Sequence, residues 1–290
     1  MTIDSGGSPN GPAPGTPAFA VPESLVAHAR RFYAAGEPPA TPRVAATVLL
    51  LRPTADGETI EVYVIRRLAA MTFGGMYAFP GGGVDPSDSA ATLDWSGPPA
   101  SAWGDRLGLP PQAAQAVLCA AAREVFEEAG VLLAGPGPGT IVGDVSGADW
   151  EEARQALVER RISFADLLRE RRLNLRSDLL LPWARWITPE FEPRRFDTYF
   201  FVALLPGGQR TRDVSGEADH TMWIRPADAL ARVDSGEIAM LPPTRVALAE
   251  IAACGGLAGL PAAASGRDVA TPVLPRLELA PDGTARFLLG

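Results

Sequence analysis

Runs of apolar residues that predict strands alternate along the chain with periodic patterns that predict helices. A continuous apolar run at 44–51 is typical of a buried strand, and 60–65 predicts a second strand after a turn at Asp56-Gly57. Further strands are expected at 183–187, 197–205 and 221–224. Helices are expected at 22–35, 111–129, 148–160, 163–172, 226–233 and 243–253. This alternation favours a layered α/β domain with a mixed sheet.

Segments without such a period suggest where the folded domain begins and ends. Residues 1–20 are rich in Gly, Pro and Ser, lack the pattern of a secretory signal and predict a disordered tail. We expect one domain over 40–255. Within it, the Ser, Gly, Pro and Trp-rich stretch 86–111 predicts a loop or insertion. Residues 256–290 are expected to form a C-terminal extension, with a hairpin that turns at Pro281-Asp282-Gly283.

Composition and charge narrow the classes of partner. The 290 residues carry a formal net charge of −8, which argues against a broad electrostatic surface for nucleic acid. It does not exclude a small phosphorylated ligand. All 26 basic residues are arginine, a bias typical of a GC-rich genome, so arginine counts alone say little about function.

The cysteines and the apolar runs bear on location. Cys119 and Cys254 are far apart and have no metal-site spacing, which fits a reducing cytoplasm. No apolar run approaches the ~20 residues that a membrane span requires. We therefore expect a cytoplasmic protein without a membrane partner.

Three glutamates define the most informative helix. Glu124, Glu127 and Glu128 stand at positions i, i+3 and i+4, so their carboxylates share one face near the helix C-terminus, where the helix dipole opposes negative charge. A cation would offset this cost, and oxygen-only ligands suit Mg²⁺ or Mn²⁺. The alternative is a solvated acidic face with a routine Arg123–Glu127 pair. Another face carries the apolar residues Leu118, Ala122, Val125 and Ala129.

The same segment resembles a known family motif. Residues 123–131, Arg-Glu-Val-Phe-Glu-Glu-Ala-Gly-Val, match the second half of the Nudix box at every specified position. The first half is similar to Gly82-x5-Asp88, with Asp where the family usually has Glu. In addition, 34 residues at 89–122 separate the two halves where the standard box has seven. The chain therefore carries an insertion, which we expect at about 89–115.

The resemblance implies a fold and a set of roles. The fold would be the Nudix-type α/β/α sandwich around a mixed sheet. Glu127 and Glu128 would be metal ligands, and Glu124 would be a further ligand or would activate the attacking water. Arg123 would brace the glutamates by a salt bridge, and the Gly82 carbonyl would complete the metal shell. The implied reaction is metal-dependent hydrolysis of a diphosphate in a small nucleotide-like molecule.

Many Nudix enzymes use a further acid from a loop before a strand that carries a Trp. Here residues 215–223 end in such a Trp and offer Glu217, with Asp219 as the alternative. A plain acidic turn is the simpler interpretation of the same residues, and the sequence does not decide between them.

Features outside the box resemble one branch of the family, that of the mammalian peroxisomal coenzyme A diphosphatase and its bacterial relatives. They are Val64-Ile65-Arg66-Arg67, Phe73-x-Gly75-x3-Phe79-Pro80-Gly81-Gly82, the long insertion, Arg194-Arg195-Phe196-Asp197-Thr198 and Leu241-Pro242-Pro243-Thr244. The branch implies cleavage of coenzyme A or acyl-coenzyme A to 3′,5′-ADP and a 4′-phosphopantetheine product. Of the four strand-end arginines, Arg66 and Arg195 are our candidates to bind substrate phosphates.

Some features keep alternatives open. Met71 stands where the coenzyme A signature carries an arginine, and Phe-Leu-Leu-Gly is not a peroxisomal address. ADP-ribose, NADH and dinucleoside polyphosphates stay possible substrates, and a non-catalytic Nudix ligand sensor is the competing class. The insertion and the C-terminal hairpin are expected either to cap the site or to form a homodimer contact.

Overall fold

The computed structural model describes residues 23–57, 59–70, 73–90, 93–214, 216, 218–279 and 285–289. The expected tail at 1–20 and the hairpin turn at 281–283 lie outside these residues, as do Met71 and Glu217.

A mixed sheet forms the centre of the fold. Its strands follow the order β10-β2-β1-β9-β8, with β3 paired to β2 and β4 paired to β1. The pairing of β1 with β9 is parallel and the other pairings are antiparallel. The strands are β1 (Arg43–Pro53), β2 (Ile60–Arg67), β3 (Tyr77–Ala78), β4 (Gly81–Gly83), β8 (Leu181–Ile187), β9 (Phe196–Leu204) and β10 (Ala218–Ile224).

Both faces of the sheet are buried, because alternate side chains of β1 enter different cores. Val48 and Leu50 pack into one hydrophobic cluster, whereas Leu49 and Leu51 pack into another. Such double burial explains why this strand is a continuous apolar run rather than an alternating one.

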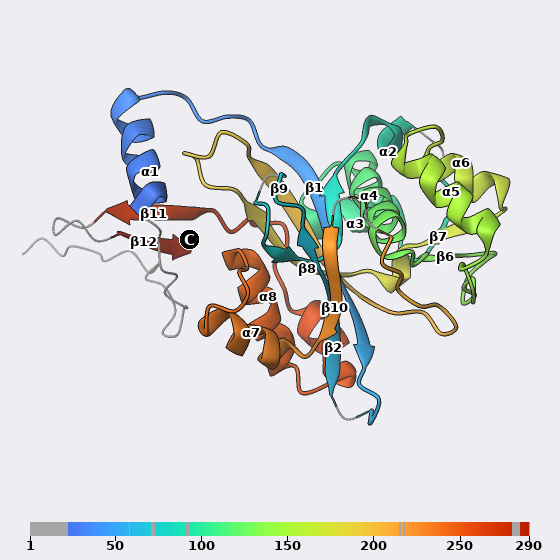
Figure 1. Ribbon diagram of the computed structural model, residues 1–290. Coiled ribbons are helices and arrows are strands. Elements are labelled where there is room, and N and C mark those ends of the chain that lie inside the picture. The colour runs from blue at the N-terminus through green and yellow to red at the C-terminus, as the bar shows by residue number, and fades with distance from the viewer. Residues whose placement is uncertain are drawn as a thin grey trace, which may run out of the picture.

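Helices cover the two faces (Figure 1). One cluster contains residues of α3 (Ala100–Leu107), α4 (Pro111–Ala129), α5 (Ala148–Val158) and α6 (Phe164–Glu170). The other contains residues of α7 (Pro226–Asp234), α8 (Pro242–Ala253) and α9 (Leu260–Ser265). The expected α/β/α sandwich around a mixed sheet is therefore confirmed.

The stretch expected to be a loop at 86–111 contains regular structure. It forms α2 (Pro86–Ala90), β5 (Trp95–Ser96) and α3, and β5 joins β7 (Asn174–Arg176) and β6 (Ala134–Gly135) in a small second sheet. The prolines before α3 suggested a loop, but Pro99 is its N-cap, where a proline is compatible with a helix start. Trp103 and Leu107, four residues apart, then bury one face of α3 against the core.

Segments from the two ends of the chain form a third, smaller cluster. Helix α1 (Glu23–Ala35) lies beside the expected hairpin of β11 (Pro275–Leu279) and β12 (Ala285–Leu289) (Figure 1). Ala29, Phe191 and Leu277 are its buried centre.

The described part of the chain has no single helix long and apolar enough to cross a bilayer. Only α8 and the segment Leu257–Ser265 reach the required length and hydropathy together, and they are bent by 104°.

Candidate active site

Helix α4 carries the three glutamates, and its opposite face holds it in the core. Leu118, Ala122, Val125 and Ala129 are fully buried, as their spacing predicted. The helix ends where Gly130 adopts a left-handed conformation and donates its N–H to the carbonyls of Val125 and Phe126. Glycine is favoured here because a side chain would be strained at its φ of 65°.

Arg123 is the centre of the carboxylate cluster. Its guanidinium donates to both oxygens of Asp88, with Nε–Oδ1 and Nη2–Oδ2 distances of 3.1 and 3.0 Å. It also donates to Glu124 at 2.8 Å and to Glu127 at 3.3 Å. A further bond to the Gly83 carbonyl at 2.9 Å ties the helix to β4. The bracing role expected for Arg123 is therefore visible in its contacts.

Asp88 serves this arginine and does not face the cleft. Its side chain is almost fully buried, and it also accepts the N–H of Asp85 at 2.8 Å and a hydrogen bond from the Cys119 thiol at 3.4 Å. The shorter side chain at this position therefore still closes the loop onto the helix. Cys119 is a small buried side chain.

The glycines of β4 allow the carboxylates to approach the strand. The Gly81 N–H donates to Oε2 of Glu128 at 2.7 Å. A Cβ at Gly82 would lie 2.4 Å from Oε1 of Glu124, so a larger residue there would displace that carboxylate. At Gly83 the nearest neighbour of an added Cβ would be 4.0 Å away.

The glutamates are not a solvated acidic face. Glu124 and Glu128 have only 9% and 5% of their surface exposed. Burial raises the pKa of Glu127, although the charge of Arg123 acts in the opposite direction. For Arg123, burial opposes the charged form, but hydrogen bonds to Asp88 and the charge of Glu124 raise its pKa well above the usual value. Negative charge is thus concentrated where little water can screen it.

A second set of ion pairs supports the C-terminus of α4. Arg154 donates to the Glu127 carbonyl at 2.8 Å and to Glu151 at 2.6 Å. Arg212 donates to the other oxygen of Glu151 at 2.8 Å. Two guanidinium groups therefore stand near the negative end of the helix dipole, where cations are stabilising.

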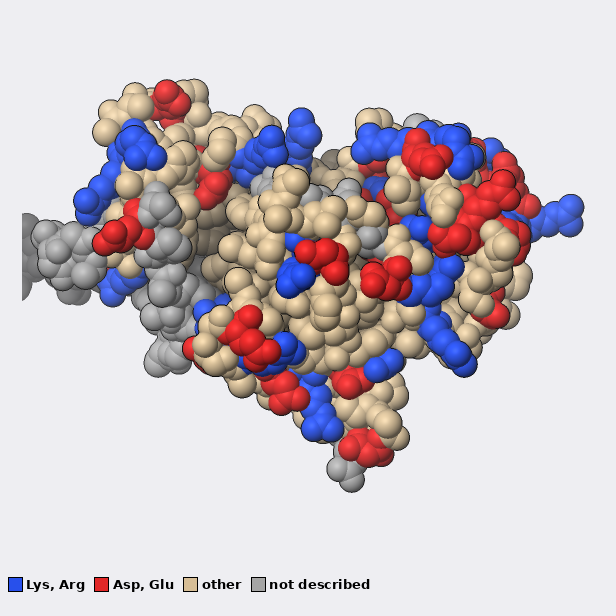
Figure 2. Space-filling model, viewed as in Figure 1, with Lys and Arg blue, Asp and Glu red and all other residues tan. Residues whose placement is uncertain are grey.

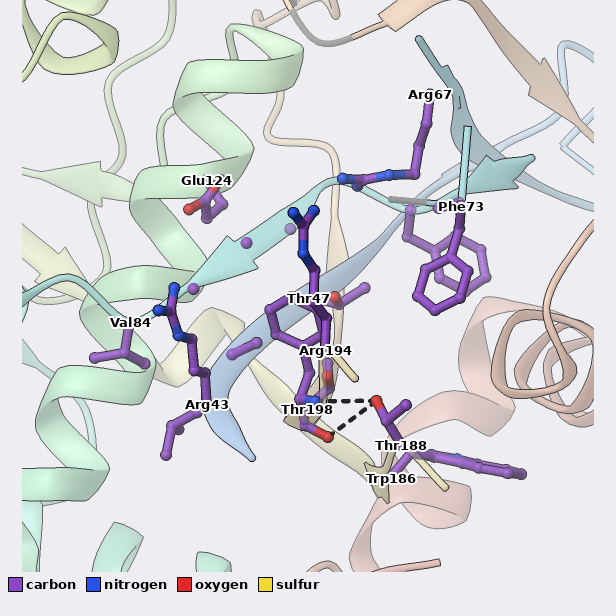
Figure 3. Close-up of a pocket in the computed structure, with 18 of the residues that line it drawn as sticks. Arg43, Thr47, Arg67, Phe73, Val84, Glu124, Trp186, Thr188, Arg194 and Thr198 are labelled. Carbon is purple, nitrogen blue, oxygen red and sulfur yellow. Dashed lines mark hydrogen bonds between the residues drawn. The ribbon is translucent and has the colours of Figure 1, made fainter. Parts of the chain in front are cut away.

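A cleft of about 1820 Å³ opens in front of the glutamates. Glu124, Glu127 and the glycines of β4 line it at one end, and Leu25, Phe191 and Phe287 line it where α1 and the hairpin contribute. Figure 3 shows Glu124 and several arginines directed into this space. On the face seen in Figure 2, acidic and basic side chains are interspersed rather than gathered in one basic surface.

The expected distal acid is only partly described. Glu217 lies outside the described residues, so its role stays a prediction. The alternative, Asp219, pairs with Arg66 at 2.6 Å and is not among the residues that line the cleft. In β10, His220 contacts the Tyr77 hydroxyl, and Trp223 packs against Tyr63.

The structure separates each pair of neighbouring arginines. Arg66 is bound to Asp219, and Arg195 donates to the carbonyls of Ala40 and Thr188, so neither lines the cleft. Arg67 and Arg194 do line it, together with Arg43. Sequence reasoning did not single out Arg43, which has no motif around it and became a candidate only through the pairing of β1 with β9.

The carboxylates around Arg123 are the candidate ligands for a divalent cation. Among the described side chains, no three acidic, His or Cys groups converge closely enough to hold an ion as they stand. Arg123 binds Glu124 and Glu127, and Gly81 binds Glu128. Their chemistry nevertheless fits Mg²⁺ or Mn²⁺, because the donors are all oxygen and three carboxylates share the guanidinium of Arg123.

Comparison with known proteins shows which family the chain belongs to. The NUDT19 Nudix domain matches residues 101–251. The acyl-coenzyme A diphosphatases NUDT19 of Xenopus laevis and Homo sapiens are 27% and 29% identical to this chain over 218 and 259 residues. These alignments cover 63% and 74% of the chain but 57% and 67% of the two relatives. The chain thus spans little more than half the length of the Xenopus protein.

A solved structure agrees with the sequence comparison. The NUDIX hydrolase from Alicyclobacillus acidocaldarius is 30% identical and superposes with a TM-score of 0.61. The match covers 75% of this chain and 94% of that protein. This likeness shows that the chain has the Nudix fold.

Proposed function

Because the chain belongs to the Nudix hydrolase family, in the branch of the NUDT19 Nudix domain, we propose that it cleaves the diphosphate of coenzyme A or acyl-coenzyme A. The products would be 3′,5′-ADP and a 4′-phosphopantetheine derivative. The relatives from frog and human carry the name acyl-coenzyme A diphosphatase, which supports this substrate class. ADP-ribose, NADH and dinucleoside polyphosphates are the alternatives within the same chemistry.

The observation that carries the proposal is the glutamate cluster at one end of a large cleft. Buried carboxylates are costly unless they are paired, and here three of them share the guanidinium of Arg123. A purely structural helix face has no need for this excess of negative charge. A site that binds a cation and a diphosphate does need it, because the cation offsets the negative charge of the carboxylates and of the diphosphate.

Glu124, Glu127 and Glu128 would hold the cation, with the Gly82 carbonyl as a further ligand. When bound, Mg²⁺ or Mn²⁺ neutralises diphosphate oxygens and lowers the pKa of a bound water. Such cations are typical of the family. Glu124 and Glu127 both line the cleft, so their oxygens are accessible from the substrate side.

The protein's own groups would position the reactants. Arg123 fixes Glu124 and Glu127 relative to β4, and the Gly81 N–H orients Glu128. A carboxylate oxygen of Glu124 or Glu127 would accept the proton of the attacking water. Phosphoryl transfer depends mainly on such positioning and on charge neutralisation.

The size of the cleft favours a long substrate. Typical ligand pockets measure roughly 300–1,000 Å³, and this cleft is about 1820 Å³. Coenzyme A has a nucleotide half and an extended pantetheine half, and an acyl group lengthens it further. The apolar residues at the end formed by α1 and the hairpin suit the less polar half.

The test is metal-dependent product formation followed by mass spectrometry. The panel contains coenzyme A, acetyl-coenzyme A, ADP-ribose, NADH and diadenosine polyphosphates, each with Mg²⁺, Mn²⁺ or chelator. Glu128→Gln removes one carboxylate of the cluster. Glu237→Gln is the matched control, because it removes a carboxylate from an exposed pair with Arg232.

Each outcome has a distinct meaning. Release of 3′,5′-ADP that needs the metal and is lost only in Glu128→Gln supports the proposal. Cleavage of another member of the panel keeps the mechanism and rejects coenzyme A. If the folded protein turns over nothing, a non-catalytic ligand sensor becomes the better interpretation.

A further inference from the structure

Arginines from three elements face the glutamates across the cleft. Arg67 comes from the end of β2, Arg43 from the start of β1, and Arg194 from the connection between β8 and β9. In Figure 3 the guanidinium groups of all three point into the space toward which Glu124 also projects. All three arginines lie outside the glycine and glutamate motif of residues 82–88 and 123–131.

Strand pairing places Arg43 and Arg194 at the same end of the sheet. Arg43 is opposite Phe196 in the parallel ladder of β1 and β9, and its backbone N–H donates to the Arg195 carbonyl at 2.9 Å. Arg194 directly precedes Arg195 in the sequence. Two positive side chains therefore project from adjacent backbones into one cavity.

Other arginines at this end of the sheet have protein partners. Arg185 forms a bidentate pair with Asp197, and Arg195 donates to two backbone carbonyls. The guanidinium of Arg43, in contrast, has no hydrogen bond or ion pair to any residue that the structure describes. Arg43 and Arg194 are both exposed residues that line the cleft, so an anion can reach their side chains.

We propose that Arg43 and Arg194 form a subsite for a phosphomonoester group of the substrate, distinct from the glutamate end that takes the diphosphate. The inference rests on the proposed function. There, the diphosphate and its cation occupy the glutamates, so an additional phosphate on the same ligand needs cations elsewhere. Guanidinium groups suit this task because they bind phosphate oxygens in pairs.

This subsite separates the candidate substrates by chemistry. Coenzyme A carries a 3′-phosphomonoester beside its diphosphate, whereas ADP-ribose and NADH carry a diphosphate alone. A phosphomonoester has a charge of about −1.5 to −2 at neutral pH, so it attracts cationic side chains strongly. The arginines would therefore select the substrate by its additional phosphate and leave the bond cleavage to the glutamate end.

The first experiment measures binding without turnover. Isothermal titration compares 3′,5′-ADP with 5′-AMP for the wild type, Arg43→Gln and Arg194→Gln. The wild type should prefer 3′,5′-ADP by roughly 10- to 100-fold, the value of a charged hydrogen-bond pair. Each variant should lose most of that preference and bind 5′-AMP as before. Arg232→Gln, from an exposed pair outside the cleft, should change neither affinity.

The second experiment measures kinetics on coenzyme A and 3′-dephospho-coenzyme A. Arg43→Gln should raise KM for coenzyme A with little change in kcat, and should leave dephospho-coenzyme A unaffected. Equal losses on both substrates would overturn the proposal, because the arginines would then act on the diphosphate. Equal binding of 3′,5′-ADP and 5′-AMP by the wild type would also overturn it. That result is independent of turnover, so it is distinguishable from a failure of the proposed function.

Discussion

At the scale of single residues, Glu127 combines a functional position with a cost to the fold. Its carboxylate is largely buried, and this burial raises its pKa. We predict that Glu127→Gln raises the midpoint of thermal unfolding by a few degrees in chelator, while it lowers hydrolysis by roughly 10²-fold or more. Unfolding followed by circular dichroism and the mass-spectrometric assay measure the two effects.

The pH dependence of this effect has a definite sign. A carboxyl group with a raised folded pKa favours the fold below its unfolded pKa, and this contribution is lost as the pH rises through the folded value. The advantage of Glu127→Gln should therefore be larger at pH 8 than at pH 5. If the variant is less stable than the wild type at pH 8, the charge of Glu127 is compensated by Arg123 and the prediction is wrong.

Gly82 and Gly83 provide a matched pair of substitutions. Gly82→Ala places a Cβ 2.4 Å from Oε1 of Glu124, whereas Gly83→Ala meets nothing closer than 4.0 Å. We expect Gly82→Ala to lower kcat/KM by roughly 10²-fold, as a displaced catalytic group does, and Gly83→Ala to retain most activity. Similar losses in both variants would show that the strand tolerates no side chain, whatever its distance from Glu124.

Sequence reasoning located the carboxylates at this scale but not all of their partners. The spacing of Glu124, Glu127 and Glu128 is set within one helix, where a period of 3.6 residues fixes their common face. Arg43 is brought to the cleft by a strand 150 residues further along the chain. No local pattern contains that pairing.

At the scale of elements, the arginine pairs illustrate a limit of sequence patterns. Neighbouring residues of an extended segment point to opposite sides, and we expected Arg66 rather than Arg67 to face the site. The pattern could not choose between them, because β2 is buried on both faces and has no polar side to set its orientation. The structure turns Arg67 to the cleft and Arg66 to Asp219.

Elements with a strong local period were predicted well. The helix at 111–129 begins and ends where expected, β9 lies within one residue of its predicted ends, and β1 lies within two. Helix α3 was missed because two prolines and two glycines in and around it outweighed its short apolar face. The two-residue strands β3, β5 and β6 are too short to produce a period.

The support at the end of α4 leads to an acid-dependent prediction. Hydrogen bonds from Arg154 lower the pKa of Glu151 to about 2. Its contribution to stability is present above the ordinary Glu pKa and is lost as the pH falls toward the folded value. Urea unfolding should therefore show a gap between the wild type and Glu151→Gln at pH 7 that shrinks between about pH 5 and pH 2.

Glu152→Gln is the control for this effect, since it removes an exposed carboxylate from the same helix. It should unfold like the wild type at both ends of the pH range. A gap for Glu151→Gln that stays constant with pH would mean that the lost side chain matters for its packing rather than its charge.

At the scale of the whole molecule, the cleft is assembled from parts distant in sequence. The glutamate end belongs to the recognised motif, whereas α1, the connection after β8 and the hairpin complete the other end. The sequence predicted the hairpin but left its role open between capping the site and forming a dimer contact. Its place in the cleft wall depends on packing with Phe191, which no periodic pattern encodes.

The third hydrophobic cluster is small, and we therefore expect the cleft wall formed by α1 and the hairpin to open locally more readily than the rest of the fold. Among the described residues, Ala29, Phe191 and Leu277 alone form its buried centre, and this cluster is separate from the two large cores. Regions with little buried apolar surface open at a smaller free-energy cost than the whole fold. Amide hydrogens of 23–35 and 275–279 should therefore exchange with deuterium faster than those of β1 and α4, and more slowly once 3′,5′-ADP is bound. Exchange as slow as that of β1 would mean a rigid wall. Otherwise, the cleft admits and releases long ligands by local breathing at its outer end, while the carboxylates stay fixed to the sheet.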